Sequence, residues 1–290
     1  MERFEFQAIG THWRIEITDA LAPSGRERLL SAIRERVESF EQTYSRFRPT
    51  STVSDIARAA GAYRLPDDAG PMLDLYKKLY DLTDGSFTPL IGQVLVDAGY
   101  DPAYSLAPKT MTVPPTWDQA LDWQRPDLIV KKPVQLDFGA AGKGYIVDLV
   151  GQLMSESGVR SFMINAGGDI LCRDAEGKAQ RIGLEHPERK DEVIGVASIA
   201  NRSICGSAGN RRAWANFHHT IDPHTLMSPK HIRAIWTVAE TTMLADALTT
   251  CLYFVSPDKL LQTFAFEYLI VRNDYSIERS PAFPAELFMA

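Results

Sequence analysis

Residues 136–148 read LDFGAAGKGYIVD, and the rest of the chain is interpreted outward from this stretch. Apolar and polar residues alternate from Val134 to Phe138, as at the end of a half-buried strand. Apolar residues then recur at helical spacing from Ile146 as far as a stop at Gly158. Between the two lies a loop with few side chains, which contains Gly139, Gly142 and Gly144. The stretch therefore predicts a strand, a glycine loop and the start of a helix.

A loop of this kind lets the backbone approach a ligand closely, and the free amides of a helix start favour an anion. Lys143 adds a positive charge. The order differs from a Walker phosphate loop, because Asp137 stands where that pattern has Gly and Gly144 follows the lysine. It also lacks the Gly-x-Gly-x-x-Gly of dinucleotide-binding folds. A tight turn that only packs a helix against a sheet is the alternative.

Composition narrows the class of protein. The 290 residues suffice for a large core, and a net charge of −6 without a basic run gives no indication of nucleic acid binding. The three cysteines form no C-x-x-C pair, which argues against a disulfide framework or a zinc knuckle. The first residues, MERFEFQAIG, contain neither an apolar signal core nor a lipid-attachment cysteine, and no apolar run could span a membrane. We therefore expect a cytoplasmic protein.

Strands and helices are predicted to mix without strict alternation, which indicates the α+β class. The predicted strands are residues 4–9, 13–18, 127–130, 134–138, 160–164, 181–184, 193–199, 233–238 and 268–271. Helices are expected to begin at Pro23, Ser51, Met72, Trp117 and Ala245, besides the one after the glycine loop. Residues 86–101 are expected to form a buried loop, 101–116 a surface excursion, 203–209 a polar turn, and the last ten a tail.

Aromatic and basic residues occur together at Tyr44-Ser45-Arg46-Phe47-Arg48. Such a group can hold a phosphate and a ring. It can equally be a surface turn with one buried Phe, since surface arginines are common. The sequence leaves both interpretations open.

Two places offer groups for chemistry. Asp246 and Thr250 are four residues apart on one helix face, and with carbonyls from a glycine turn they suit Mg²⁺. Alternatively, Asp246 caps the helix and Thr250 faces solvent. His219, three residues before Asp222, is a candidate general base, or one of a structural pair with His218. A zinc site there lacks a third and fourth ligand at suitable spacing.

Seven stretches in one order resemble the ApbE family of bacterial flavin transferases, the FAD:protein FMN transferases, over about residues 8–272. They are AIGTHWRI (8–15), YSRFRPTSTVS (44–54), DGSFTPLIG (84–92), LDFGAAGKGYIVD (136–148), INAGGDI (164–170), HTIDP (219–223) and ADALTT (245–250). The resemblance implies one flavin transferase domain over residues 1–290, with mixed sheets, packed helices, a T-fold-related architecture and room for two intertwined lobes.

The resemblance also implies a reaction. Members of the family bind FAD with Mg²⁺ and break its pyrophosphate. They pass FMN to a Ser or Thr hydroxyl of a partner flavoprotein, as a phosphoester, and release AMP.

On this sequence, the resemblance implies a role for each site residue. Asp246, Thr250 and the Gly142 carbonyl fall on the metal positions, and His219 falls on the candidate base. Asp246 counts as catalytic as well. The expected cofactor-binding residues are Gly139, Lys143, Gly167, Gly168, Ser207 and Asp222.

The chain departs from the family pattern near the expected phosphate, adenosine or acceptor site. Leu226 follows His224-Thr225 where the family has Gly, and Pro229 comes one place late. Gly206 replaces a Thr or Ser, and Ala57 replaces an Asn. Two alternatives to transfer therefore stay open: an FAD pyrophosphatase, or a flavin-binding protein without catalysis.

Overall fold

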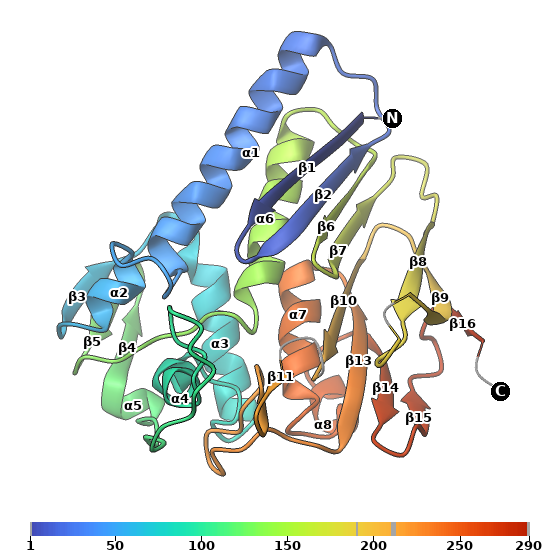
Figure 1. Cartoon of the computed structure of the whole chain (residues 1–290). Helices are drawn as coiled ribbons and strands as arrows, with labels where there is room; N and C mark the ends of the chain where they lie inside the picture. The colour runs from blue at the N-terminus through green and yellow to red at the C-terminus, as the bar shows by residue number, and fades with distance from the viewer. Residues whose placement is uncertain (1, 190, 210–212, 289–290) are drawn as a thin grey trace.

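The structure, a computed structural model, describes residues 2–189, 191–209 and 213–288. Its main element is an antiparallel sheet of eight strands in the order β1-β2-β6-β7-β10-β13-β14-β15 (Figure 1). These strands are β1 (Glu2–Ala8), β2 (Thr11–Ile17), β6 (Phe162–Ala166), β7 (Asp169–Arg173), β10 (Ser203–Ala208), β13 (Ile232–Ala239), β14 (Glu267–Arg272) and β15 (Ile277–Arg279).

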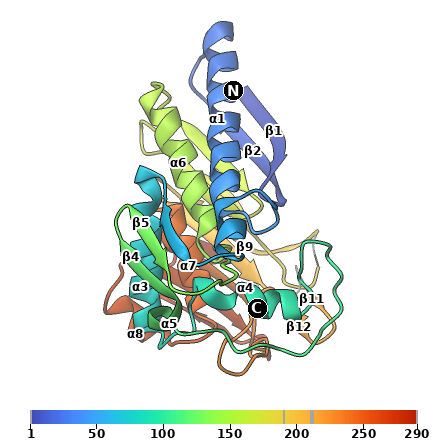
Figure 2. The ribbon, with the colours of Figure 1, turned by 90° about the vertical axis from the view of Figure 1, so that its left-hand side faces the viewer.

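Helices cover one face of this sheet, with α1, α6 and α7 following one another along it (Figures 1 and 2). The helices are α1 (Pro23–Tyr44), α2 (Thr52–Ile56), α3 (Gly70–Leu82), α4 (Gly92–Asp97), α5 (Trp117–Ala120), α6 (Gly142–Glu156), α7 (Thr242–Cys251) and α8 (Pro257–Leu261). In α1, Leu29, Ile33, Val37 and Phe40 recur at helical spacing and are buried, as the sequence predicts. The mixture of helices with mostly antiparallel strands confirms the α+β class.

A smaller sheet, in the order β16-β9-β8, packs on the opposite face. Its strands are β8 (Gln180–Glu185), β9 (Val193–Ile199) and β16 (Ala285–Leu287). Side chains alternate across the large sheet: in β13, Ile235 joins the apolar core under the helices, whereas Trp236 joins the core between the sheets. The large sheet therefore separates two apolar cores.

The remaining strands form two small sheets. One has the order β3-β5-β4, from β3 (Gly61–Arg64), β4 (Leu121–Gln124) and β5 (Asp127–Val130), and the other pairs β11 (Ala213–Trp214) with β12 (Phe217–His218). A third apolar cluster joins α4 to the β11–β12 hairpin through Val94, Leu95, Ala98, Trp214 and Ile221. No helix in the described ranges combines the length and the apolar character that crossing a membrane requires.

Residues 134–138 differ from prediction, because they belong to no strand. The apolar alternation is real, since Val134, Leu136 and Phe138 are buried. The backbone hydrogen bonds, however, go to helical residues and not to a strand. Val134 N–H donates at 3.3 Å to the carbonyl of Ile56, the last residue of α2, and Asp137 N–H donates at 2.8 Å to the carbonyl of Pro89, the first residue of a short 3-10 helix. The segment that leads into the glycine loop is thus tied to α2 and to this 3-10 helix instead of belonging to a sheet.

Three further predictions of irregular structure are wrong. The expected polar turn at 203–209 is strand β10, which lies inside the sheet between β7 and β13. The expected buried loop at 86–101 contains helix α4. The expected C-terminal tail contains β16, which pairs with β9, while residues 289 and 290 lie outside the described residues. Strand β10 is fixed by contacts with distant residues: the Ser203 hydroxyl bonds the Thr242 hydroxyl of α7 at 2.9 Å.

Candidate functional site

A cleft of about 1150 Å³ lies where the glycine loop, strand β10 and helix α7 meet. This volume is slightly above the range of about 300–1,000 Å³ that is typical of small-molecule sites. Its lining residues run from Glu5 to Phe254, so distant parts of the chain contribute to one wall. Nine predicted site residues line this cleft: Gly139, Gly142, Lys143, Gly167, Gly168, Ser207, His219, Asp246 and Thr250.

Helices α6 and α7 cross at Gly144, and this crossing forms the floor of the site. A Cβ atom on Gly144 would lie 2.3 Å from the Thr242 carbonyl oxygen and 2.8 Å from Cβ of Asp246. Only glycine allows so close an approach. The Gly144 N–H, one of the unpaired amides of the helix start, donates to Asp246 Oδ2 at 3.0 Å.

Asp148, on α6, fixes the start of α7. Its two carboxylate oxygens accept from the N–H groups of Thr242 and Met243, each at 2.8 Å. The Thr241 hydroxyl accepts from the Leu244 N–H at 3.2 Å and caps the same end. Asp246 therefore projects from the second turn of a helix whose first turn is tied to α6.

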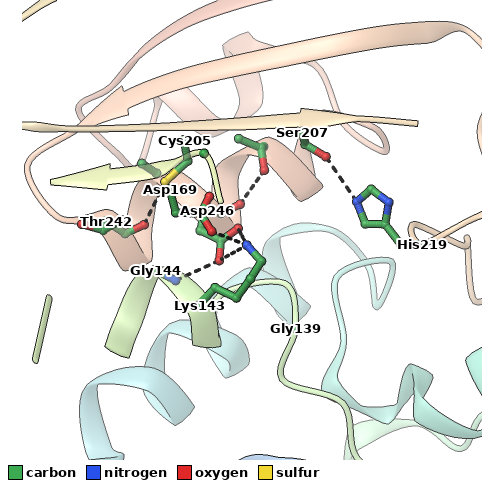
Figure 3. Close-up of polar contacts among 12 residues, drawn as sticks. Gly139, Lys143, Gly144, Asp169, Cys205, Ser207, His219, Thr242 and Asp246 are labelled. Atoms are coloured by element: carbon green, nitrogen blue, oxygen red, sulfur yellow. Dashed lines mark hydrogen bonds and ion pairs between the residues drawn. The ribbon is translucent and has the colours of Figure 1, made fainter. Parts of the chain in front are cut away.

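Lys143 lies between two buried carboxylates, and Figure 3 shows its amine directed at both. Its Nζ pairs with Asp169 and lies 3.3 and 3.4 Å from the two oxygens of Asp246. Asp169 and Asp246 are 2% and 5% exposed. The expectation that the helix start meets an anion is thus met here by a carboxylate of the protein itself.

The charges of this cluster do not balance, since two carboxylates share one ammonium. Burial and the charge of Asp169 raise the pKa of Asp246 to about 7. Lys143 and the Gly144 amide act in the opposite direction and do not offset this rise. Burial lowers the pKa of Lys143, but the two carboxylates outweigh it and raise that pKa overall. The lysine stays protonated, and the three groups together lack one positive charge.

The groups near this cluster that could bind a cation are hard oxygen ligands. Thr250 is one turn beyond Asp246 in α7 and, like Gly142, reaches the cleft wall. Among the described residues, no group of three or more His, Cys, Asp and Glu side chains is placed to hold a metal ion. A donor set of one carboxylate, a hydroxyl and a carbonyl fits Mg²⁺, which usually completes its octahedron with waters and substrate phosphates.

The second glycine turn joins β6 to β7. Gly167 and Gly168 have φ angles of 68° and 105°, which side-chain-bearing residues rarely adopt. The Asn165 side chain accepts from the Gly168 N–H at 3.0 Å and fixes the turn. Asp169 follows at once, so the turn that opens the cleft wall also delivers a carboxylate to Lys143.

His219 faces the cleft from the segment after β12, and its Nε2 lies 3.5 Å from the Ser207 hydroxyl (Figure 3). His218 next to it is structural. Its Nδ1 accepts from the Thr220 N–H at 3.2 Å and its Nε2 is 2.8 Å from the Pro229 carbonyl. These two hydrogen bonds place a ring proton on Nε2 and leave Nδ1 as the acceptor, and burial lowers the pKa of His218. The two adjacent histidines thus have different environments.

Asp222 is not among the residues that line the cleft. Its carboxylate accepts from the His224 N–H at 2.8 Å, and its backbone bonds Leu226 and Met227. The structure therefore gives it a turn-forming contact, and its predicted role in cofactor binding stays a prediction.

Two carboxylates of the site were not predicted from the sequence. Asp169 neighbours the Gly167-Gly168 turn, so its position directly after a glycine turn was an available signal. Asp148 ends the opening stretch, but nothing in its local sequence indicates that it caps a helix nearly a hundred residues later.

The chain was compared with known proteins. A profile of the ApbE family matches residues 9–269. A protein of Haemophilus influenzae named FAD:protein FMN transferase is 26% identical over 270 residues, covering 84% of this chain and 78% of the relative. The Escherichia coli K12 protein of that name is 22% identical over 294 residues, covering 92% and 82%.

Solved structures are similar across almost the entire chain. The crystal structure of an ApbE protein from Thermotoga maritima has a TM-score of 0.83 at 22% identity and covers 98% of this chain and 99% of that one. The flavin transferase ApbE from Vibrio cholerae has a TM-score of 0.79 at 18% identity and covers 97% of each. These likenesses confirm the predicted fold.

Proposed function

The chain belongs to the ApbE family, and from this premise we propose that it is an Mg²⁺-dependent FAD:protein FMN transferase. Its curated relatives are named as transferases of this kind. The proposed substrates are FAD and a flavoprotein that carries a Ser or Thr acceptor, and the products are the FMN-modified protein and AMP.

The observation that carries the proposal is the unbalanced acidic cluster at the cleft wall. Lys143 is shared by Asp169 and Asp246, and burial leaves Asp246 with a raised pKa. Such perturbed carboxylates concentrate at functional sites. A cluster that accepts a cation beside a large cleft suits a substrate whose diphosphate is itself a ligand for that cation.

Asp246, Thr250 and the Gly142 carbonyl are the proposed holders of Mg²⁺. When bound, the ion would neutralise charge on the diphosphate and on the departing phosphate oxygen. The fit rests on the oxygen donors and on the missing positive charge described above. The ammonium of Lys143 adds to the same electrostatic stabilisation.

His219 is the proposed general base. It accepts the proton of the acceptor hydroxyl, whose oxygen forms a bond to the phosphorus of the FMN half. The bond from that phosphorus to the bridging oxygen breaks, and AMP leaves with this oxygen. Its ring lines the cleft, with Nε2 3.5 Å from the Ser207 hydroxyl, where an acceptor hydroxyl would enter.

The test is the mass of the acceptor. The purified chain is mixed with FAD, Mg²⁺ and a candidate flavoprotein, and the intact mass of the flavoprotein is measured. We expect a gain of one FMN less one water, with one AMP released per transfer. AMP and free FMN formed at the same rate without any acceptor would select FAD hydrolysis instead. Bound flavin without AMP release would select a flavin-binding protein.

The extent of the domain and the compartment of the enzyme are also proposed. We propose that residues 1–290 act as one domain, which is supported by a cleft lined from Glu5 to Phe254. We also propose that the enzyme acts in the cytoplasm.

A further inference from the structure

Arg46, from the aromatic and basic segment 44–48, has buried hydrogen-bond donors that lack acceptors inside the cleft wall. Its side chain is 2% exposed. Its Nε donates to Asp137 Oδ2 at 2.5 Å. The two terminal nitrogens, Nη1 and Nη2, are buried and have no hydrogen-bond partner within the described part of the chain. A guanidinium has only donors, so this site lacks acceptors.

Aromatic rings fix the plane of this guanidinium. Its Cζ lies 4.2 Å from the centroid of the Phe47 ring and 5.0 Å from that of Tyr100. Such stacking leaves the N–H bonds pointing sideways, in the plane of the group. Arg46, Phe47 and Tyr100 all line the cleft.

Asp137 connects Arg46 to the glycine loop. Its second oxygen, Oδ1, accepts from the Gly139 N–H at 2.7 Å. The same loop leads within a few residues to Gly142 and Lys143, at the diphosphate end of the proposed site. A ligand that is bound at Gly142 and Lys143 and extends along the glycine loop would therefore lie beside Arg46.

The pair of Arg46 and Asp137 is neutral overall, so the unmet need is for hydrogen-bond acceptors and not for charge. The diphosphate of FAD would bring two negative charges to a balanced pair. A planar ring with carbonyl oxygens on its edge supplies acceptors and stacks among aromatic side chains. Of the two rings of FAD, adenine has no carbonyl group, whereas the flavin carries a pyrimidinedione with two.

We propose that Arg46 is the residue that recognises the pyrimidinedione of the flavin, its terminal nitrogens donating to a carbonyl oxygen of that ring. The inference rests on the proposed function, because it takes a flavin as the substrate.

The ring of Tyr104 packs against the same aromatic side chains and also lines the cleft. Its ring stacks on Phe47 with centroids 5.6 Å apart and planes 12° apart. It is 53% exposed and has a φ of 51°, a backbone conformation that costs energy for a residue with a side chain.

Binding of half-ligands tests the assignment. The full chain in the presence of Mg²⁺ is titrated with riboflavin, which carries the dione but no phosphate, and with ADP, which carries the other half. Arg46→Lys keeps an ammonium for Asp137 but lacks the second pair of donors. Arg48→Lys is the matched control, since Arg48 pairs with Glu38 and Glu41 and does not line the cleft.

We expect Arg46→Lys to weaken riboflavin binding by about tenfold or more and to leave ADP binding unchanged, because hydrogen bonds from a charged donor are lost. Arg48→Lys should change neither. The assignment is overturned if wild type does not bind riboflavin, if Arg46→Lys binds it as wild type does, or if ADP binding falls equally or alone. If Arg46→Lys does not fold, the double variant Arg46→Met with Asp137→Asn removes both charges and should show the same selective loss.

This outcome is independent of the proposed reaction. A wild-type chain that binds riboflavin through Arg46 but transfers no FMN would refute the transferase and leave the assignment of Arg46 intact. A chain that transfers FMN while Arg46→Lys binds riboflavin normally would refute only the assignment.

Discussion

Asp246→Asn should make the metal-free protein more stable while it abolishes AMP release. The substitution keeps the size of the side chain and an acceptor for the Gly144 N–H, but removes one of two carboxylates that share Lys143. The raised pKa of Asp246 means that the folded state disfavours its ionised form.

The magnitude follows from the pKa. A change from the ordinary 3.8 to about 7 corresponds, at about 1.4 kcal/mol per pH unit, to an upper limit of about 4 kcal/mol. The weaker contact of the amide with Lys143 reduces this, so we expect a gain of about 1–2 kcal/mol at pH 8. Because the folded-state pKa lies above the unfolded one, wild type loses stability as pH rises from about 4 to about 7. The advantage of the variant should therefore grow over this window and level off above it.

Urea denaturation in EDTA, at several values between pH 4 and pH 8, measures the free energy of unfolding. Asp258→Asn is the control, because that carboxylate is exposed on α8 and its removal should give no such pH-dependent gain. Adding Mg²⁺ at pH 8 should stabilise wild type and not Asp246→Asn. An Asp246→Asn protein less stable than wild type at pH 8 would refute the reasoning that the cluster carries excess negative charge.

Three other substitutions probe the site. Gly144→Ala should push α6 and α7 apart at Thr242 and cost about 1–3 kcal/mol, measured by urea denaturation, and a neutral result would contradict the close packing. Asp148→Ala should cost about 1–2 kcal/mol by uncapping α7, again measured in urea, and an unchanged midpoint would contradict the capping role. His219→Ala should slow FMN transfer by about a hundredfold with riboflavin affinity unchanged, measured by acceptor mass and fluorescence titration; equal loss of both would make the residue structural.

The sequence predicted those parts of the fold that depend on the spacing or type of neighbouring residues. The spacing of apolar residues in α1 predicted a helix, because all residues of its buried face lie within this one segment. The turn at Gly167-Gly168 could be recognised because only glycine readily takes its φ angles. The nine cleft residues followed from the joint order of motifs, since no one motif indicates which chain segments meet.

The rest depends on contacts between distant residues. Strand β10 is rich in small and polar residues and resembles a turn, yet Ser203 faces the hydroxyl of Thr242 and Cys205 pairs with Asp169. Residues 134–138 have the alternation of a strand, but their N–H groups donate to the carbonyls of helical residues, Ile56 and Pro89. Alternation reports burial and does not report which backbone accepts the hydrogen bonds.

The central claim is that Asp246 holds a divalent cation beside the diphosphate of FAD. Crystals of the wild-type chain soaked with Mn²⁺ and ADP, measured for the anomalous scattering of manganese, test it most directly, because Mn²⁺ takes the same octahedral oxygen sites as Mg²⁺. We expect a peak in contact with the Asp246 carboxylate and the Thr250 hydroxyl, facing the diphosphate. A peak elsewhere in the cleft, with Asp246 still bound to Lys143, would contradict the account.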